Sequence, residues 1–574
     1  MMMTKELEGE KLFWYQFLRT KFQIIINNNE EIKYVTDGQI LRIDHNKDPQ
    51  KPPEILNNLE QIKYLQWHGQ YGQNLKKVGK WKTSWKGQIL KNIGGQYTED
   101  GKKIGAWREL RSNYTEQAQV YEVGEYFDDQ RIGEWKYFFG DQEIGGGDYN
   151  EQGLKDGNWI DLSELFQKDK QITYNGMYNF GKKIGRWTEC LRQNGYQSFT
   201  EIGGGYYDNQ GKELKVGIWI ELIDFRKDKQ VTFNGLYQNG YKIGRWNILS
   251  DEYLSDSFEI MYQYYETFVL SGGGSYDQQG LKNGKWIELN DSFFIGNNIK
   301  YCGEYKKSEK VGIWDLYWSD DRQAKLIGGG LFEIENGQLK NGNWIDSSDN
   351  FEKFRQITNN GVYKNGKKFG QWKTYWRESA KDNFIYCSGG NYHQFEFGIK
   401  EGKWTELNET FTKSNQTIYE GEYKNNKKVG RWNILLRRDH SLLEKIGGGN
   451  YNYENGLKQG KWIELWDNFR DDSQVTYNGE YKNGQRIGRW DIYYREILGE
   501  NFELIGGGSY DMQKQGIKQG NWIELSDTFS NWSQTIYQGQ YLNSMKVGKW
   551  EEKKRDCYAF SKRFVKKREM FFEV

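Results

Sequence analysis

The stretch Tyr477-Asn-Gly-Glu-Tyr-Lys-Asn-Gly-Gln-Arg-Ile-Gly-Arg-Trp490 recurs with small changes along most of the chain. Within it, Asn483-Gly484 separates two short aromatic runs, and Asn-Gly is the strongest short-range signal for a two-residue turn of type I′. Both turn positions need a positive φ, which glycine adopts freely and asparagine tolerates. The stretch therefore predicts a tight β-hairpin.

A turn at this dipeptide fixes the register of the two strands. The predicted cross-strand pairs are Lys482–Gln485, Tyr481–Arg486, Gly479–Gly488 and Tyr477–Trp490. Because side chains alternate between the two faces of a strand, the tyrosines and the tryptophan share one face with the two glycines. We expect large rings to lie over the bare backbone at these glycines.

The composition indicates a thin, aromatic-rich structure rather than a globule. Aromatic residues make up 17% of the 574 residues and hydrophobic residues only 36%, so large rings supply much of the surface that can be buried. A single compact core is not expected at this length. The 81 basic and 80 acidic residues nearly cancel, which gives no support for a nucleic-acid partner.

The cellular environment is predicted from cysteines and apolar runs. The four cysteines form no Cys-x-x-Cys pair and are expected to be free thiols. The first residues carry charges throughout and show no signal-peptide cleavage pattern. No run approaches the roughly 18 apolar residues of a transmembrane helix. We expect a soluble cytoplasmic protein without a transmembrane segment.

From about His68 onward the chain is a repeat. A Gly-x-Trp closure occurs seventeen times between Trp81 and Trp550. Two kinds of unit alternate, because every second unit opens with a glycine run such as Gly506-Gly-Gly508 instead of the Tyr-Asn-Gly motif. Such periodicity marks a repeat architecture. We predict an all-β fold, an elongated solenoid or ribbon of successive antiparallel β-hairpins.

The chain divides into four segments. Residues 1–48 are a non-repeat N-terminal cap, 49–67 a linker with all three prolines, 68–550 the repeat array, and 551–574 a basic C-terminal cap. Repeat arrays need covered ends, and the patterns of both caps are compatible with short helices. A sheet closed on itself would also protect its edges, but the open-ended repeat favours a solenoid.

No catalytic constellation emerges from the sequence. The four histidines do not follow the period, and Cys387 with His393 is too small a group for a zinc site. The glycine runs could cradle phosphate, but none leads into Gly-Lys-Ser/Thr, and their repetition favours backbone bulges or room for rings. We expect no enzymatic activity, no cofactor and no metal.

Acidic residues recur with the period at Glu221, Glu288, Glu464 and Glu524. Paired catalytic carboxylates at a fixed separation are one interpretation, as in glycosidases. The favoured interpretation is a solvated acidic stripe that faces the Lys and Arg residues of adjacent loops.

The best candidate interaction surface is the row of basic residues at the hairpin turns, together with the C-terminal segment. Most aromatic rings, in contrast, are expected to serve the fold. The candidate residues are Lys182, Lys183, Arg186, Lys242, Arg245, Lys427, Lys428, Arg431, Arg486, Arg489, Lys562, Arg563, Lys566 and Lys567.

The repeated Tyr-x-Gly-x-Tyr-x-x-Gly-x-x-x-Gly-x-Trp pattern, as in Tyr419–Trp432 and Tyr477–Trp490, resembles the MORN repeat. The resemblance covers roughly residues 68–550. The chain departs from that pattern in its closing tryptophan, its longer unit and its alternating glycine runs. The resemblance implies a ribbon of β-hairpins, scaffolding at membranes or the cytoskeleton, and phospholipid binding.

Two functional hypotheses follow. The first is a non-enzymatic scaffold or adaptor for protein partners, located in the cytoplasm or beside a membrane or cytoskeletal structure. The alternative is a peripheral membrane module that binds anionic phospholipid through the basic turns and the C-terminal segment. A third, polysaccharide binding by exposed aromatic rows, would require a secretory signal, and none is visible.

Overall fold

The computed structural model describes most of the chain. The described residues are 3–13, 16–26, 31–45, 58–72, 76–164, 166–192, 198–226, 229–251, 272–290, 299–320, 323–333, 339–349, 351–352, 355–379, 381–396, 398–438, 443–496, 501–513, 516–555 and 563–572.

The N-terminal region forms its own antiparallel sheet of four strands in the order β1-β2-β3-β4. The strands are β1 (Met3–Phe13), β2 (Gln16–Ile26), β3 (Glu31–Thr36) and β4 (Gln39–His45). The prediction of a helix in this region is therefore wrong. In β2 the buried residues Phe22 and Ile24 alternate with the exposed Lys21 and Gln23, which is the period of a strand. β-Branched isoleucines favour that conformation.

One short helix, α1 (Leu59–Tyr64), follows the N-terminal sheet. The side chain of Asn58 accepts hydrogen bonds from the backbone N–H groups of Glu60 and Gln61 and so caps the helix. The helix buries Leu59 and Ile62 against the N-terminal sheet.

The rest of the described chain forms one large antiparallel sheet, in which the strands follow one another in chain order. Its first strands are β5 (Leu65–Tyr71), β6 (Lys77–Trp85), β7 (Gln88–Tyr97), β8 (Lys103–Leu110), β9 (Val120–Phe127), β10 (Gln130–Phe139), β11 (Gln142–Tyr149), β12 (Lys155–Leu162), β13 (Gln171–Asn179), β14 (Lys182–Arg192), β15 (Thr200–Tyr207), β16 (Lys215–Arg226), β17 (Lys229–Gln238), β18 (Tyr241–Asp251), β19 (Gly272–Tyr276), β20 (Lys282–Leu289), β21 (Ile299–Lys306) and β22 (Glu309–Asp320). The sheet continues with β23 (Gln323–Phe332), β24 (Lys340–Ser347), β25 (Gln356–Lys364), β26 (Lys367–Arg377), β27 (Ile385–Tyr392), β28 (Lys400–Leu407), β29 (Thr417–Lys424), β30 (Lys427–Arg437), β31 (Leu443–Tyr451), β32 (Lys458–Leu465), β33 (Gln474–Lys482), β34 (Gln485–Arg495), β35 (Glu503–Tyr510), β36 (Lys518–Leu525), β37 (Gln534–Leu542), β38 (Met545–Arg555) and β39 (Val565–Phe572).

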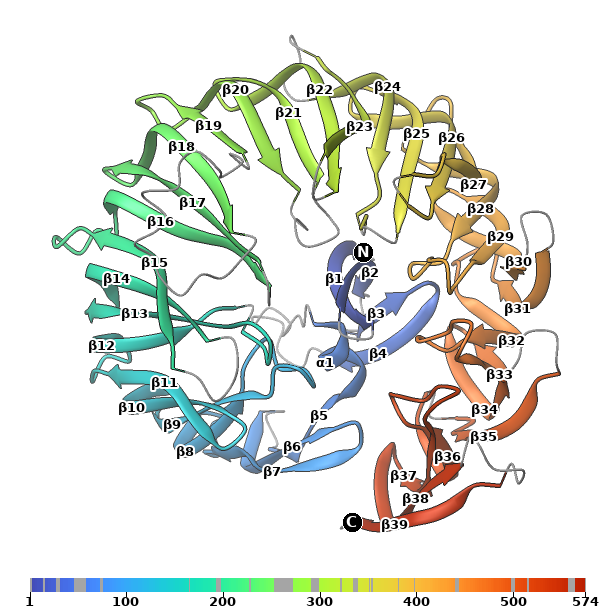
Figure 1. Cartoon of the computed structure of the whole chain (residues 1–574). Coiled ribbons are helices and arrows are strands. Elements are labelled where there is room, and N and C mark those ends of the chain that lie inside the picture. Colours follow the sequence, from blue (N-terminus) through green and yellow to red (C-terminus); the bar gives the residue numbers. More distant parts are fainter. Residues whose placement is uncertain are drawn as a thin grey trace.

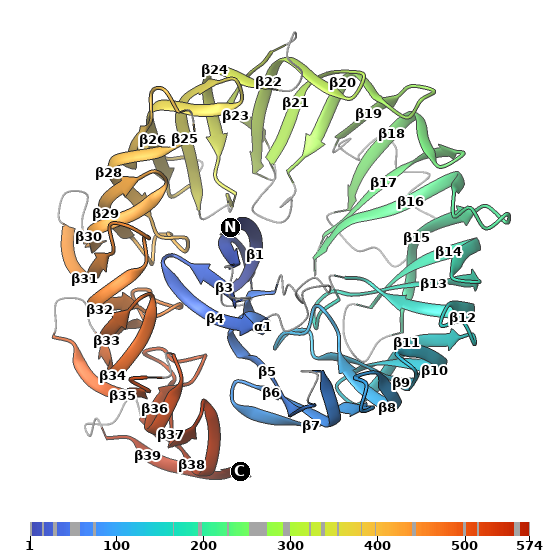
Figure 2. The ribbon, with the colours of Figure 1, turned by 180° about the vertical axis from the view of Figure 1, so that it is seen from behind.

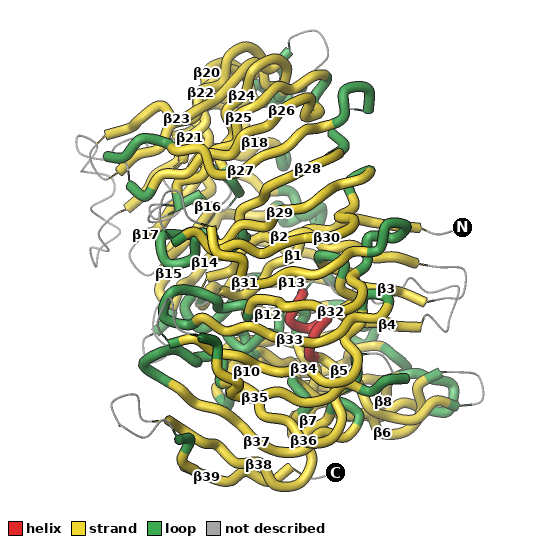
Figure 3. Tube along the Cα trace, turned by 90° about the vertical axis from the view of Figure 1, so that its right-hand side faces the viewer, coloured by secondary structure: helices red, strands yellow, loops and turns green. Residues whose placement is uncertain are grey.

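The large sheet curves into a ring that surrounds the N-terminal sheet, as both face views show (Figure 1, Figure 2). A side view shows that strands make up most of the structure and that the one helix, α1, lies among them (Figure 3). The sheet closes on itself. Near the two ends of the sheet, the backbone N–H of Lys546 in β38 donates to the carbonyl of Gly87, in the turn between β6 and β7, over 3.0 Å. The predicted all-β array of successive antiparallel hairpins is thus confirmed, and the array curves into a ring (Figure 1).

The hairpin turn forms as predicted, with φ of 50° at Asn483 and 77° at Gly484. Next to the turn, the predicted pairs Lys482–Gln485 and Tyr481–Arg486 are confirmed. Further along the predicted register is wrong.

Tyr477 pairs with Ile492 instead of Trp490, because the ladder is interrupted between Asn478 and Glu480. At this bulge the backbone turns at Gly488, which has a φ of 60°. The ring of Trp490 folds back over Gly479, where a Cβ atom would lie 2.2 Å from the indole. The expected ring over bare backbone is therefore present, but it is reached through a bulge.

The tryptophans and tyrosines form one continuous row along the array. The ring of Trp490 lies 5.2 Å from Tyr481 at 85° and 6.3 Å from Tyr510 at 84°. Edge-to-face contacts of this kind are favourable for aromatic quadrupoles. All seventeen closing tryptophans are buried, and none is more than 6% exposed. The rings therefore build the core of the sheet, as predicted.

Each glycine of a run is required for a different reason. A Cβ atom on Gly506 would lie 2.8 Å from the carbonyl of Ile523, and one on Gly508 would lie 2.1 Å from the Trp522 ring. Gly507 has a φ of 131° and packs against the carbonyl of Trp490. Backbone bulging and room for rings, the predicted explanation, are both observed.

The C-terminal segment supplies β39 rather than the expected helix. Strand β39 pairs with β38, and the side chains of Met570 and Phe572 alternate onto the face of Trp550. Phe572 extends the aromatic row, with its ring 6.3 Å from that of Trp550. The predicted cap is thus a further strand of the array.

Candidate functional site

A ladder of charges runs along the aromatic row. In strand β32, Lys458, Trp462 and Glu464 are separated by even numbers of residues and therefore share one face. The ammonium of Lys458 lies 2.6 Å from the carboxylate of Glu464 and 4.7 Å from the centre of the Trp462 ring. The lysine thus makes an ion pair and a cation–π contact at once.

The next hairpin brings a phenol and a second cation to the same carboxylate. The hydroxyl of Tyr481 donates to Glu464 over 2.9 Å, and the guanidinium of Arg486 lies 2.8 Å away. Only 10% of the Glu464 side chain is exposed. Burial raises the pKa of Glu464, but the ion pairs with Lys458 and Arg486 outweigh it and hold that pKa below its usual range.

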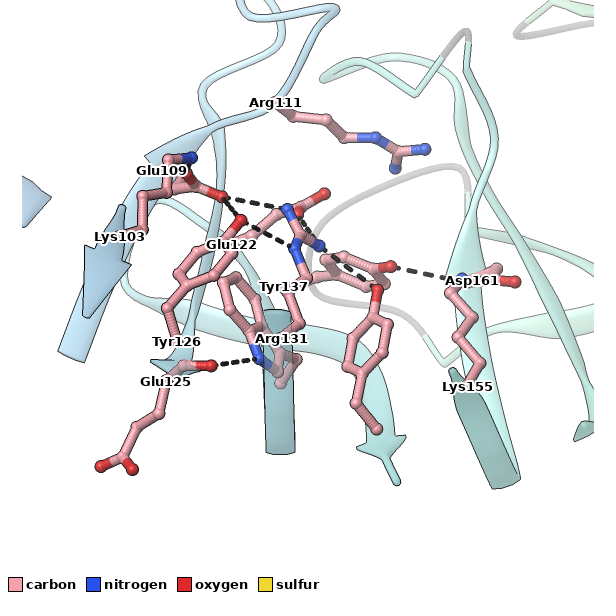
Figure 4. Close-up of polar contacts among 12 residues, drawn as sticks. Lys103, Glu109, Arg111, Glu122, Glu125, Tyr126, Arg131, Tyr137, Lys155 and Asp161 are labelled. Carbon is pink, nitrogen blue, oxygen red and sulfur yellow. Dashed lines mark hydrogen bonds and ion pairs between the residues drawn. The ribbon is translucent and has the colours of Figure 1, made fainter. Parts of the chain in front are cut away.

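The same arrangement recurs at six glutamates, which we call the glutamate sites. Each pairs with the lysine six residues before it and with a cation of the following hairpin. The distances to that following cation are 3.0 Å for Glu109–Arg131, 2.7 Å for Glu221–Lys242, 2.9 Å for Glu288–Lys310, 3.5 Å for Glu406–Lys428, 2.8 Å for Glu464–Arg486 and 3.3 Å for Glu524–Lys546. Figure 4 shows the first of them, with Arg131 reaching Glu109.

Two further positions carry aspartate, and we call them the aspartate sites. Asp161 lies beside Lys155 (Figure 4) and pairs with it. Asp161 also accepts a hydrogen bond from Tyr178 over 2.7 Å. Asp346 contacts Lys340 at 2.5 Å and Tyr363 at 2.8 Å in the same way. Both carboxylates are one methylene shorter than glutamate.

The cations that follow the aspartate sites are Lys183 and Lys368. Among the described residues, no carboxylate lies within 4.0 Å of either ammonium. Lys183 instead lies 4.3 Å from the centre of the Trp187 ring, and Lys368 lies 4.2 Å from that of Trp372. Burial lowers the pKa of Lys183 and of Lys368. Each is a half-buried cation that the ladder does not neutralise.

The prediction of a solvated acidic stripe is wrong in one respect. The periodic glutamates do face Lys and Arg side chains, but only 10 to 22% of the Glu221, Glu288, Glu464 and Glu524 side chains is exposed. Ion pairs with the neighbouring cations keep the pKa of Glu221 and of Glu288 low despite burial. These carboxylates are internal ion-pair partners.

The predicted row of basic residues is divided between two faces. Lys183, Lys242, Lys428 and Arg486 turn inward over tryptophan rings. The alternation along a strand places the other six on the exposed side. These are Lys182, Arg186, Arg245, Lys427, Arg431 and Arg489.

Several exposed members of this row already have partners. Lys182 pairs with Glu213 at 3.1 Å, Arg186 with Glu201 at 2.7 Å and Arg489 with Asp491 at 2.7 Å. In the C-terminal segment Arg563, Lys566 and Lys567 are exposed, and Lys566 contacts Glu569. Lys562 and Cys557 lie outside the described residues.

The charge ladder also binds a residue from the N-terminal sheet. The turn between β3 and β4 places Asp37 against strands β30 to β32 of the ring. Lys428 donates to Asp37 over 2.7 Å, Tyr451 donates over 2.9 Å, and the ammonium of Lys458 lies 3.6 Å away. Burial raises the pKa of Asp37, but Lys428 and Lys458 lower it to about 2. We call this group of Lys428, Tyr451 and Lys458 the Asp37 site.

Backbone bonds hold the same turn in place. The N–H of Lys458 donates to the carbonyl of Gly38 over 3.0 Å, and the N–H of Ile40 donates to the carbonyl of Gly484 over 2.8 Å. A Cβ atom on Gly38 would lie 2.7 Å from the carbonyl of Gly456, so glycine is needed at this position. The Asp-Gly dipeptide signals a hairpin turn in the sequence, but its docking against residues some 400 positions away has no local signal.

A cavity of about 670 Å³ separates the N-terminal sheet and α1 from the ring. Its wall includes Asp37 and Glu60 on one side and Glu406, Lys428 and Arg486 on the other. The part of the charge ladder from Glu406 to Arg486 therefore faces the interior of the ring, and the repeated register places the other sites on the same face of the sheet.

Cys190, Cys302 and Cys387 are free thiols, and no group of three or more His, Cys, Asp or Glu side chains among the described residues could hold a metal ion. No described helix has the length and apolar character needed to cross a membrane.

Comparison with known proteins gives little guidance. No protein-family model matches the sequence, and no curated protein matches it. Among solved structures, the K499G mutant of NanB sialidase from Streptococcus pneumoniae aligns over 93% of this chain and 82% of its own, with 9% identity and a TM-score of 0.19. NanB sialidase in complex with 2-[(3-chlorobenzyl)ammonio]ethanesulfonate aligns over the same shares, with 10% identity and a TM-score of 0.19. At these TM-scores the likeness carries no argument.

Proposed function

We propose that the protein is a non-enzymatic cytoplasmic scaffold that binds protein partners on the inner face of its ring. One intramolecular observation carries the proposal. The ring already holds a β-hairpin that is distant in sequence, through the ion pairs of Asp37 and the backbone bonds at Gly38. A face that holds one hairpin in this way offers the same contacts to turns of other proteins.

The charge ladder supports binding rather than catalysis. General acid–base catalysis needs a group whose pKa lies near the working pH. Ion pairs hold the pKa of Glu464 and of Glu406 below the usual range of a carboxyl, because each lies between cations. The resemblance to the MORN repeat also favours scaffolding, beside a membrane or a cytoskeletal structure.

Affinity capture with the full-length protein tests this proposal. The expected result is a partner retained in stoichiometric amount whose chemical cross-links fall on inner-face lysines such as Lys183 and Lys242. A variant with glutamate at Lys182 and Lys427, both on the exposed side, serves as the matched control and should retain the partner. The proposal fails if no partner is retained, or if the purified protein turns over esters, glycans or nucleotides.

A second candidate function is binding of anionic phospholipid through β39. In this strand Lys567 is exposed between Val565 and Phe571, whose exposed fractions are 60% and 73%. Basic and apolar side chains together suit a charged lipid surface. Flotation with phosphatidylserine vesicles should then show binding that is lost in high salt and in a Lys566→Glu/Lys567→Glu variant. Equal flotation of the variant would rule out this candidate.

A further inference from the structure

The Asp37 site has close counterparts elsewhere in the ring. Its three residues occupy fixed register positions, since Lys428 pairs with Tyr423 and Lys458 pairs with Tyr451 across neighbouring strands. The same positions are occupied by Lys183, Tyr207 and Lys215 after Asp161, and by Lys368, Tyr392 and Lys400 after Asp346. We call these groups the Lys183 site and the Lys368 site.

The geometry of the first lysine is the same in all three sites. The ammonium lies 5.8 Å from the Tyr207 ring centre in the Lys183 site and 5.9 Å from that of Tyr392 in the Lys368 site. In the Asp37 site the corresponding distance, from Lys428 to Tyr451, is 5.9 Å. The two counterparts therefore present an ammonium and a phenol in the arrangement that binds Asp37.

What differs is the negative charge already present. Lys428 lies 3.5 Å from Glu406 and still binds Asp37 over 2.7 Å. Lys183 and Lys368 follow aspartates that do not reach them, so an added carboxylate would meet less repulsion there than Asp37 meets. The pKa values of the three lysines show the same difference. Burial lowers the pKa of Lys428, but Asp37 and Glu406 outweigh it and raise that pKa. At Lys183 and Lys368 burial dominates and lowers the pKa.

The tyrosines of the two counterparts are also more exposed than the tyrosine of the Asp37 site. Tyr451, which the Asp37 turn covers, is only 3% exposed. Tyr207 and Tyr392 stay partly exposed, as do Lys183 and Lys368. The tyrosine in both counterparts is therefore less covered than Tyr451 is.

We propose that the Lys183 and Lys368 sites bind side-chain carboxylates of a protein partner, each presented on a tight Asp-Gly turn as Asp37 is. This inference rests on the scaffold function proposed above and names the ligand chemistry of its inner face. The carboxylate would contact the free lysine and the tyrosine hydroxyl, with the second lysine of the site nearby. The lysine then gains the charge partner that the shorter aspartate does not supply.

The chain supplies its own probe for the test. A cyclised peptide of residues 31–45 reproduces the β3–β4 hairpin, and the same peptide with Asp37→Asn is its control. Titration calorimetry of the full-length protein should show two salt-sensitive sites for the first peptide. The control should bind at least ten-fold more weakly, because the ion pair with the ammonium is lost.

Two protein variants remove the sites in different ways. Lys183→Met/Lys368→Met removes both ammonium groups, and Asp161→Glu/Asp346→Glu fills both sites from within, as in the glutamate sites. Lys183→Met/Lys368→Met should reduce binding at least ten-fold. Asp161→Glu/Asp346→Glu should weaken binding less, because Lys428 still binds Asp37 beside Glu406. Lys310→Met is the matched control and should bind like the wild type, because Phe332 replaces the tyrosine there and offers no hydroxyl. Circular dichroism confirms that each variant is folded.

Several results would overturn the inference. These are no binding of the first peptide, equal binding of the Asn peptide, or unchanged binding by both double variants. Self-association that Lys183→Met/Lys368→Met abolishes would overturn the assignment to another protein, because a second copy would then supply Asp37. If the double variant still captures the partner of the wild type, the scaffold function stands and the carboxylate sites do not.

Discussion

The glutamate and aspartate sites differ by one methylene group, and that difference decides how the charges of the ring are neutralised. At a glutamate site such as Glu221, the carboxylate bridges Lys215 at 2.5 Å and Lys242 at 2.7 Å. At Asp161 the carboxylate reaches Lys155 but not Lys183. The strand register is the same in both, so the shorter side chain of Asp161 accounts for the gap in its ion-pair chain. The gaps leave the ammonium groups of Lys183 and Lys368 without a carboxylate within 4.0 Å among the described residues.

The largest expected effect comes from removing a bridging carboxylate. Glu464→Gln leaves Lys458 and Arg486 facing each other in a site where only 8% and 23% of these side chains is exposed. Breaking a buried ion pair in this way costs about 3–5 kcal/mol. Asp346→Asn removes the ion-pair partner of Lys340 only. Because Lys340 is 31% exposed, this change should lower the free energy of unfolding by about 1–2 kcal/mol. Urea unfolding of both variants measures the difference, and equal losses would contradict the comparison.

Removing a paired cation and removing an unpaired cation should change the stability in different directions. Lys310→Met leaves the buried Glu288 with one cation and should cost about 1–2 kcal/mol. Lys183→Met keeps an apolar side chain on Trp187 and removes a charge without an ion-pair partner, so stability should be unchanged or rise by up to about 1 kcal/mol. Thermal unfolding compares the two. A loss of stability in Lys183→Met as large as that in Lys310→Met would argue that Lys183 does have an ion-pair partner.

Exchanging the two carboxylates should convert one site into the other. Asp161→Glu extends the carboxylate toward Lys183 and should stabilise the protein by about 1 kcal/mol, a typical gain for one added hydrogen-bonded ion pair. Glu221→Asp moves the carboxylate away from Lys242 and should destabilise the protein by about the same amount. The pair is measured by the shift in unfolding midpoint. Shifts of the same sign would show that length is not the deciding factor.

The smallest expected effect is the pH dependence of the docked hairpin. The pKa of Asp37 is lowered from 3.8 to about 2 in the folded protein. A lowered carboxyl pKa adds stability that is complete above 3.8 and is lost as the pH falls toward 2. With 43% of the side chain exposed, solvent screening limits this gain to about 1 kcal/mol. The stability difference between wild type and Asp37→Asn should therefore shrink between pH 4 and pH 2, and a constant difference would contradict it.

Much of the fold follows from local sequence. The Asn483-Gly484 turn, the alternation of hairpins and the role of glycine runs all depend on backbone conformations that particular residues require. The register predicted beyond the turn is wrong because the Trp490 ring folds over Gly479, and this packing accompanies a bulge that strand periodicity does not encode. Closure of the ring is a sum of small twists between strands, and no single residue specifies it.

The candidate site shows the same division. The sequence places Glu221 and Glu464 in register with basic turns, which the structure bears out. Their burial was not expected, because it depends on neighbouring hairpins packing their lysines over tryptophan rings. The contact between Asp37 and Lys428 joins residues far apart in the chain and could be found only in three dimensions. The Asp-for-Glu exchange at Asp161 was visible in the sequence but had no meaning without the cation positions.

The most direct test of the central claim is a pair of double-mutant cycles on unfolding free energy. One cycle combines Glu221→Gln with Lys242→Met, and the other combines Asp161→Asn with Lys183→Met. A coupling energy of about 1–2 kcal/mol is expected for the first cycle and one near zero for the second, because only residues in contact couple. Equal coupling in the two cycles would contradict the account.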